Sequence, residues 1–364
     1  MEYKFDQIAF NSTAKKLPED SDRQHYIGLE HLDTNCLYVS RWGSDVTPIG
    51  EKLLMKKGDV LFGKRRAYQR KVGIAPFDGI FSAHGMVLRP KEDVMDKDYF
   101  PFFISSDQFM ERAVRISVGG LSPTVNWKDL KEQLFDIPSL EEQRILASKL
   151  WAAYHLQEEY KRLLSATDEM VKSRFIEMFG NPVTNSKSWP TKPLSEVAPE
   201  SPSTNKATGL VWVLNLDMVE SQSGRVIEKV YDNVENLNSV AAFDDENVLF
   251  SKLRPYLNKV VIPNGKGYAT TELVPLRPDT TIVRKEFLAC LLRSNDFVNY
   301  ADAIATGTKM PRMPMTALRD FKCIIPPVDL QDEFIKVSRQ ADKSKFELKQ
   351  AIDKIDRVMR SLLQ

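Results

Sequence analysis

The sequence predicts a mixed α+β protein that contains two copies of one unit, each a strand-rich domain followed by a long helix. The first observation is a repeat: residues 60–74 recur 188 positions later as residues 248–262, with nine of the 15 positions identical. The same offset, without a gap, also relates Leu88-Arg-Pro90 in the first copy to Leu276-Arg-Pro278 in the second. Such self-similarity indicates a duplicated architecture.

The second observation is that a stretch without Gly or Pro follows each copy, at 140–179 and at 328–364. Stretches of this length that lack helix breakers favour long helices. We therefore predict four segments, which are a first domain (1–138), a first, central helix (139–180), a second domain (181–327) and a second, C-terminal helix (328–364).

Short β-prone stretches bounded by turn residues predict the strands of each domain. In the first copy they lie at 26–32, 60–62, 71–75 and 86–89, and in the second at 211–216, 248–250, 259–262 and 274–277. Residues 98–114 and 284–303 have a helical pattern.

Both long helices carry apolar residues at alternating spacings of three and four, the pattern of a coiled-coil seam. Neither helix can bury this stripe alone, so we predict two pseudo-twofold-related helices that pack antiparallel. The predicted seam consists of Leu146, Leu150, Ala153, Tyr160 and Leu164 in the first helix and Phe334, Val337, Leu348, Ile355 and Val358 in the second.

Composition limits the possible functions. The 364 residues include 51 Lys and Arg against 50 Asp and Glu, a net charge of +1, so any nucleic-acid surface must be local. Apolar runs fall short of the roughly 18 residues that a membrane span needs. The acidic N-terminus does not match a signal peptide. Three widely spaced cysteines, Cys36, Cys290 and Cys323, predict buried thiols in a reducing cytoplasm.

The repeated segment is also the first candidate site. Five basic residues and no acid lie between Val60 and Val72, and several recur in the second copy. Lys and Arg neutralise phosphates, and Tyr donates to a phosphate or stacks on a base. The alternative is a solvated basic loop, but repetition of the polar positions favours function. The predicted DNA-binding residues are Lys64, Arg66, Tyr68 and Lys71 in the first copy and Lys252, Arg254, Tyr256 and Lys259 in the second.

A second candidate is the irregular segment 305–315, which corresponds to 117–127 in the first copy. Gly, Pro and hydroxyl residues occur in both segments, while the other side chains differ. This is expected of two units that recognise different ligands. A purely structural loop is the alternative. The predicted polyanion contacts are Thr306, Thr308, Lys309 and Arg312.

Catalytic and metal-binding motifs are not found. Residues 58–64 match seven positions of a phosphate-binding loop, but Arg65 replaces the hydroxyl residue that holds magnesium. The four histidines lack metal-ligand spacing. Glu159-Tyr-Lys161 lies in a helix without an upstream acidic partner, which argues against a nuclease.

Several motifs, in this order and twice, resemble the specificity (S) subunits of type I restriction-modification enzymes. They are residues 59–68 and 247–260, the loop Gly307–Met313, the helix entries 137–143 and 325–331, and Met178-Phe-Gly-Asn-Pro182. The resemblance covers essentially the whole chain.

The resemblance implies two target-recognition domains, each reading one half of a bipartite, asymmetric site in double-stranded DNA. The helices would set the spacer and dock two methyltransferase subunits, and restriction subunits would join some complexes. The chain itself would bind no cofactor, because S-adenosylmethionine, ATP and Mg belong to the partner subunits. The alternatives are a specificity subunit of a methylation-only or type II-like system, or a coiled-coil adaptor that does not bind DNA.

Overall fold

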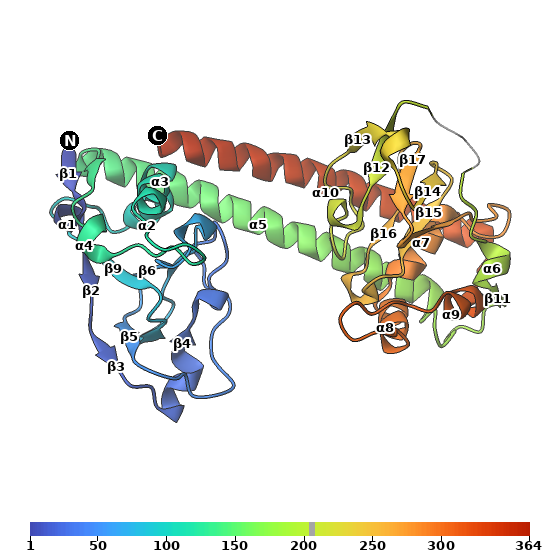
Figure 1. The fold of residues 1–364 in the computed structure, drawn as a ribbon, viewed down its shortest axis with the longest axis horizontal. Helices are drawn as coiled ribbons and strands as arrows, with labels where there is room; N and C mark the ends of the chain where they lie inside the picture. The colour runs from blue at the N-terminus through green and yellow to red at the C-terminus, as the bar shows by residue number, and fades with distance from the viewer. Residues whose placement is uncertain (204–207) are drawn as a thin grey trace. The chain divides into compact units, whose positions relative to one another are not determined.

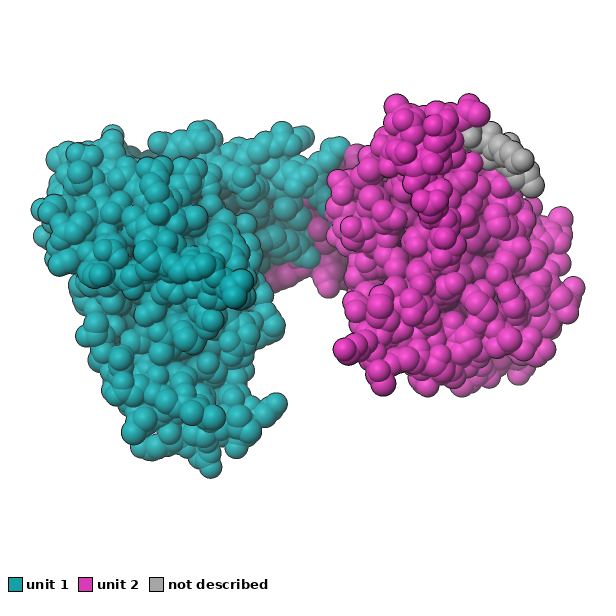
Figure 2. Space-filling model, in the orientation of Figure 1, with its two compact units in different colours: residues 1–161, 349–364 teal, residues 162–348 magenta. Residues whose placement is uncertain are grey.

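The computed structural model describes residues 1–203 and 208–364 and divides into two compact units (Figures 1 and 2). Unit 1 contains residues 1–161 and 349–364, and unit 2 contains residues 162–348. Each long helix, α5 (Leu140–Phe179) and α10 (Val328–Leu362), therefore contributes residues to both units. The four predicted segments divide the chain by element type instead, and their boundaries stay a prediction.

Unit 1 contains two four-stranded sheets, of order β2-β9-β6-β7 and β3-β5-β8-β4, and a β1-β10 pair. The strands are β1 (Glu2–Lys4), β2 (Ala9–Ser12), β3 (Lys15–Lys16), β4 (Tyr26–Ile27), β5 (Lys52–Met55), β6 (Val60–Phe62), β7 (Val72–Ile74), β8 (Gly79–Phe81), β9 (Met86–Pro90) and β10 (Leu134–Asp136). The helices are α1 (Phe5–Ile8), α2 (Phe100–Ser105), α3 (Asp107–Arg115) and α4 (Trp127–Leu130).

Unit 2 has the sheets β16-β15-β18 and β13-β12-β17-β14 and a β11-β19 pair. The strands are β11 (Thr191–Pro193), β12 (Leu210–Leu214), β13 (Val230–Asn233), β14 (Val240–Phe243), β15 (Val248–Ser251), β16 (Val260–Val261), β17 (Gly267–Thr270), β18 (Leu273–Leu276) and β19 (Lys322–Ile324). The helices are α6 (Leu194–Val197), α7 (Lys285–Arg293), α8 (Asn295–Ala303) and α9 (Met315–Asp320).

The repeated Val-Leu-Phe sequence forms the central strand of each unit and is buried on both faces. Val60 and Phe62 of β6 belong to a core shared with the helices, whereas Leu61 belongs to a core on the opposite face of the strand. Val248, Phe250 and Leu249 of β15 divide in the same way. Because successive side chains of a strand point to opposite faces, three consecutive apolar residues mark a strand covered on both sides.

Two predicted helices are each divided in two, and one predicted strand is shortened. Residues 98–114 form α2 and α3, and residues 284–303 form α7 and α8. The breaks fall at Ser106 and Ser294, whose extended backbones end one helix and whose hydroxyls cap the next. A serine N-cap satisfies an orphan helix donor, which periodicity alone does not reveal. The predicted strand 26–32 ends at Ile27 and continues as a 3₁₀ turn.

The long helices pack antiparallel, as predicted. Within unit 2, the ring centroids of Phe175 and Phe334 are 5.5 Å apart, and Arg174 lies 3.3 Å from Glu333. Farther along α10, Lys345 pairs with Asp168 at 2.9 Å, so residue numbers fall along α5 as they rise along α10. Within unit 1, Met359 and Leu362 pack against the core that contains Leu150. The mixed fold and the paired helices confirm the predicted fold class.

The seam itself departs from the predicted one at Val358, which is 55% exposed, while the neighbouring Met359 packs on the unit 1 core. A straight α-helix drifts by about 20° per heptad from a strict seven-residue repeat, so the last predicted position has rotated away. Phe334 and Leu150 are fully buried. The other predicted seam residues are half-buried, namely Leu146, Ala153, Tyr160, Leu164, Val337, Leu348 and Ile355.

Of the helices in residues 1–203 and 208–364, none combines the length and apolarity needed to cross a bilayer. The cysteines are all free thiols. Cys323 is buried, as predicted, whereas Cys36 and Cys290 are half-buried.

Candidate nucleic-acid interface

The basic segment of unit 1, residues 63–71 (the basic turn), has a tightly defined backbone. It leaves β6 and returns as β7, closed by the Gly63 N–H donating to the Lys71 carbonyl at 2.9 Å. Arg66 and Arg70 have left-handed φ values of 57° and 51° on either side of a 3₁₀ turn. Non-glycine residues adopt this conformation only where their surroundings enforce it. The Arg66 N–H accordingly donates to the Pro123 carbonyl at 2.7 Å.

The glycine-containing segment 117–124 (the glycine loop) lies against the basic turn. Val118 and Thr124 exchange backbone hydrogen bonds of 3.1 and 2.9 Å around Gly119, whose φ is 114°. Arg65 forms an isolated β-bridge with Thr124. The basic turn and the glycine loop therefore form one surface, which we call the loop pair.

Unit 2 contains a second loop pair, made of a basic turn (251–259) and a glycine loop (305–312), with the corresponding backbone hydrogen bonds. Arg254 and Asn258 have φ values of 50° and 48°, and the Arg254 N–H donates to the Pro311 carbonyl at 2.7 Å. Thr306 and Arg312 exchange hydrogen bonds of 2.9 Å around Gly307, whose φ is 104°. The 188-residue offset therefore holds in three dimensions.

Several predicted site residues of the loop pairs reach solvent. Tyr68 is 54% and Tyr256 43% exposed. The remaining exposed members are Arg66, Thr306, Thr308, Lys309 and Arg312, and Lys64, Lys252 and Arg254 are half-buried. The structure thus brings the two predicted segments of each unit together, which the sequence did not establish.

Two of the predicted residues have internal partners instead. The Lys71 ammonium donates to the Leu29 carbonyl and the Lys259 ammonium to the Leu216 carbonyl, each at 2.6 Å. Burial lowers the pKa of Lys259, and burial followed by repulsion from Lys15 lowers the pKa of Lys64. An internal hydrogen bond is sufficient to explain why Lys71 recurs as Lys259.

The two loop pairs differ in the position of the arginine that a carboxylate neutralises. In unit 1 this is Arg70, which lies 2.8 Å from Asp107. In unit 1 the Arg66 Nε donates to the Ser122 hydroxyl at 3.2 Å, and Arg65 donates to the same oxygen at 3.3 Å. In unit 2 Arg312 pairs with Glu272 at 2.8 Å, and the hydrogen bond to this carboxylate raises the pKa of Arg312. Glu272 stands at the position of His84. Each loop pair therefore contains five basic residues, one of which, Arg70 or Arg312, is paired with a carboxylate.

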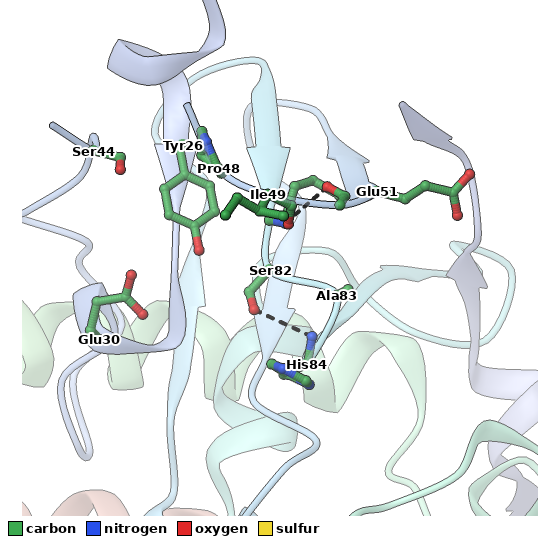
Figure 3. A pocket seen from close by; sticks show the side chains of 11 residues that line it. Tyr26, Glu30, Ser44, Pro48, Ile49, Glu51, Ser82, Ala83 and His84 are labelled. Carbon is green, nitrogen blue, oxygen red and sulfur yellow. Dashed lines mark hydrogen bonds between the residues drawn. The ribbon is translucent and has the colours of Figure 1, made fainter. Parts of the chain in front are cut away.

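A cavity of about 520 Å³ opens beside the unit 1 loop pair, and sequence reasoning did not find it (Figure 3). Tyr26, Glu30, Ser82 and His84 lie around it. It adjoins the basic turn because the Arg65 N–H donates to the His84 carbonyl at 3.3 Å. The sequence feature that could have indicated this cavity is His84, which has no histidine counterpart in the second copy.

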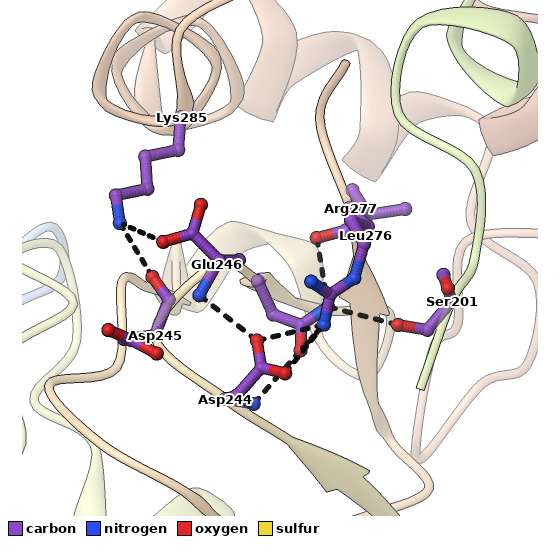
Figure 4. Close-up of polar contacts among 8 residues, drawn as sticks. Ser201, Asp244, Asp245, Glu246, Leu276, Arg277 and Lys285 are labelled. Carbon is purple, nitrogen blue, oxygen red and sulfur yellow. Dashed lines mark hydrogen bonds and ion pairs between the residues drawn. The ribbon is translucent and has the colours of Figure 1, made fainter. Parts of the chain in front are cut away.

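Ionic contacts lie at the start of the central strand in each unit. In unit 1 Arg89 forms a two-bond contact with Asp59 at 2.6 and 2.7 Å, and this hydrogen bonding raises the pKa of Arg89. In unit 2 the corresponding Arg277 instead contacts Asp244 at 2.8 Å and the amide of Asn247, while Lys285 contacts Glu246 nearby (Figure 4).

Within residues 1–203 and 208–364, no cluster of three His, Cys, Asp or Glu side chains is arranged to hold a metal ion. The segment 58–64 contains buried strand β6, so its Val-Leu-Phe sequence serves the core rather than a nucleotide.

Part of the chain matches a known protein family. Residues 12–162 match the model of the type I restriction modification DNA specificity domain. The type I restriction enzyme EcoDI specificity subunit of Escherichia coli is 24% identical over 120 residues, which are 32% of this chain and 26% of that protein. The match thus spans about a quarter of the curated relative.

Two solved structures resemble the fold over the full chain. A type I restriction-modification system S subunit from M. genitalium matches with a TM-score of 0.57 and 13% identity, covering 100% of this chain and 96% of the other. A chain from a study of complex assembly and conformational transition of the type I R-M system matches with a TM-score of 0.56 and 16% identity, with the same coverage. At this identity the likeness shows the fold alone.

Proposed function

The chain belongs to the family of type I restriction-modification DNA specificity proteins, and on that premise we propose that it reads a bipartite, asymmetric sequence in double-stranded DNA. The observation that carries the proposal is the loop pair, which occurs once in each unit with the same backbone and different side chains. The same backbone with different side chains is expected of two domains that bind two different half-sites.

Within each loop pair we assign the exposed groups to DNA contact. In unit 1 these are Arg66 and Tyr68 with the half-buried Lys64, and in unit 2 they are Tyr256, Thr306, Thr308 and Lys309 with the half-buried Lys252 and Arg254. Guanidinium and ammonium groups contact phosphates or guanine edges, and threonine hydroxyls donate to either. Lys71 and Lys259 support the turn, and Arg312 contributes less because Glu272 neutralises it.

We further propose that the chain has no catalytic activity of its own. S-adenosylmethionine, ATP and Mg would be bound by partner methyltransferase and restriction subunits. In the unit 2 part of α5, Leu163, Met170 and Ile176 are 41–50% exposed, which supports docking of a methyltransferase subunit on this helix. Exposed apolar side chains on a helix mark interaction surfaces.

Selection from a pool of random duplex DNA tests this function. The full chain, with its methyltransferase subunit present, should enrich sequences with two fixed blocks separated by an unspecified gap. Changing Arg66 and Tyr68 to Ala should weaken selection of one block only. Arg319→Ala, in an exposed pair with Glu200, is the matched control. Enrichment of one continuous block, or of no sequence, would contradict the proposal.

A further inference from the structure

An exposed acidic residue occurs at the same position of the fold in both units. Strands β4 and β12 pair in parallel with β8 and β17, which correspond to each other at the 188-residue offset. Each is followed by a 3₁₀ turn, Leu29–His31 in unit 1 and Leu216–Met218 in unit 2. The middle residue of this turn is Glu30 in unit 1 and Asp217 in unit 2, and both are exposed. A carboxylate therefore recurs at this position.

The basic turn of each unit is bonded to the 3₁₀ turn that carries the acid. In unit 1 the Lys71 ammonium donates to the Leu29 carbonyl at 2.6 Å. In unit 2 the Lys259 ammonium donates to the Leu216 carbonyl at 2.6 Å. The accepting residue immediately precedes the acid in both cases. Each hydrogen bond therefore places a carboxylate next to the surface that we assign to DNA contact.

Neighbouring groups confirm where the two carboxylates lie. Glu30 lines the cavity beside the unit 1 loop pair, together with Tyr26 and His84 (Figure 3). Burial, followed by the charge of Glu30, raises the pKa of Tyr26. In unit 2, burial lowers the pKa of Lys259 against the opposing effect of the charge of Asp217. Glu30 is therefore a neighbour of the loop-pair cavity, and Asp217 is a neighbour of the basic turn.

These two carboxylates differ from the other acids near the loop pairs. Asp107 pairs with a basic-turn arginine in unit 1, and Glu272 pairs with Arg312 in unit 2. Among residues 1–203 and 208–364, by contrast, no ion pair or hydrogen bond uses the carboxylate of Glu30 or Asp217. A free carboxylate repels DNA phosphates, because like charges repel. Neither an internal contact nor phosphate binding therefore explains why an acid recurs here.

A carboxylate can instead recognise a base edge that donates hydrogen bonds. In the major groove cytosine presents only its N4 amino group, whereas adenine presents its N6 amino group beside the N7 acceptor, and guanine presents two acceptors. A carboxylate has two acceptor oxygens and no donor, so the adenine N7 repels it. Acidic side chains accordingly accept hydrogen bonds from cytosine N4 in protein–DNA complexes.

We propose that Glu30 in unit 1 and Asp217 in unit 2 are specificity-determining residues, each accepting a hydrogen bond from the N4 amino group of one cytosine in its half-site. The inference rests on the proposed function, since it requires that the loop pairs bind DNA. It adds a contact that discriminates among bases to the phosphate contacts of the basic turns. Lys71 and Lys259 are then positioning residues, which hold the 3₁₀ turn that carries the acid.

Selection from random duplex DNA, with the methyltransferase subunit present, tests the two acids separately. The parent chain should enrich at least one C·G pair in each block. Glu30→Gln replaces an acceptor oxygen by an amide donor, so the preference for one C·G pair should fall by about tenfold or more, in one block only. Asp217→Asn should do the same in the other block. Glu51→Gln is the matched control, because Glu51 lines the same cavity as Glu30 but pairs with Lys15 at 3.5 Å.

The outcomes separate this inference from the proposed function. A parent chain that enriches no two-block sequence would overturn both. If the parent enriches two blocks and the folded variants Glu30→Gln and Asp217→Asn enrich the same bases, the chain reads DNA but these acids do not. Lost preference at an A·T pair would overturn cytosine as the recognised base. An equal gain in affinity for all duplexes would mean that the acids only repel phosphates. Far-ultraviolet circular dichroism confirms folding of each variant.

Discussion

Unit 1 and unit 2 have the same backbone frame but differ in the side chains that fill it at the junction of the long helices. Unit 1 closes the junction with Tyr154 and Phe102, whereas unit 2 has Asp342 and Cys290 there and remains hollow. Nearby, the two units are equivalent: Gln143 and Gln331 are fully buried and make the same three hydrogen bonds. Buried hydrogen bonds to the backbone therefore fix the same backbone arrangement in both units, whereas the side chains that fill the junction differ.

The largest expected effect is in the filled junction. Tyr154→Ala removes a ring that is 2% exposed and leaves the Leu37 N–H without its acceptor, so unit 1 should lose about 3 to 5 kcal/mol of unfolding free energy. Asp342→Ala at the corresponding site removes a solvent-accessible ion pair and should change stability by less than about 1 kcal/mol. Urea unfolding measures both. Equal losses would mean that the unit 2 junction is packed as tightly as that of unit 1.

The shared glutamines give a matched pair. Gln143→Leu would leave the Asp96 N–H and the Val94 and Pro138 carbonyls without partners, and Gln331→Leu would do the same to Arg284, Ile282 and Pro326. Each change should destabilise its unit by about 3 kcal/mol, because buried backbone groups lose their partners. Hydrogen exchange, read separately for each unit, distinguishes the two. A large effect in only one unit would show that the frames are not energetically equivalent.

Arg66 donates to a hydroxyl and Arg312 pairs with a carboxylate, and this difference predicts a smaller, DNA-dependent effect. Arg66→Ala should reduce the slope of log binding constant against log salt by about one unit if Arg66 contacts a phosphate. Arg312→Ala should reduce it by much less, since Glu272 already neutralises that guanidinium. Binding of a cognate duplex at several salt concentrations gives both slopes. A larger change for Arg312 would reverse the assignment.

The smallest effect concerns pH and a second pair of corresponding sites. The Gly28 N–H donates to the His31 Nδ1 at 2.9 Å, whereas in unit 2 the Asn215 N–H donates to the Met218 sulfur at 3.4 Å. Burial, opposed by Glu30 and assisted by Arg41, lowers the pKa of His31. Because the folded state favours neutral His31, its contribution is present above the unfolded pKa of about 6.5 and is lost as pH falls below it.

His31→Met should therefore flatten the dependence of unit 1 stability on pH in the weakly acidic range. Urea unfolding at a series of pH values compares this variant with the parent chain, and Met218→Leu is the control in unit 2. An unchanged pH dependence in His31→Met would assign the titration to another group.

The duplication, the long helices and the doubly buried central strands could be predicted from the sequence, because each leaves a local signal. The recurrence of residues 60–74 shows the repeat directly, and three consecutive apolar residues mark a strand packed on both faces. The absence of Gly and Pro between Leu140 and Phe179 is sufficient for the long helix. These features depend on which residues are neighbours in the chain.

The candidate sites depended on which residues become neighbours in space. Basicity marked Lys71 and Lys259, but only the tertiary structure showed that their ammonium groups are bonded to backbone carbonyls. The pairing of Arg312 with Glu272, 40 residues apart, is likewise a tertiary contact. The hollow junction of unit 2 is lined by Cys290 and Arg293 of α7 and by Ser338 of α10, which are far apart in the sequence. Local propensity determines elements, whereas a side chain's charge and accessibility are decided by what the fold places against it.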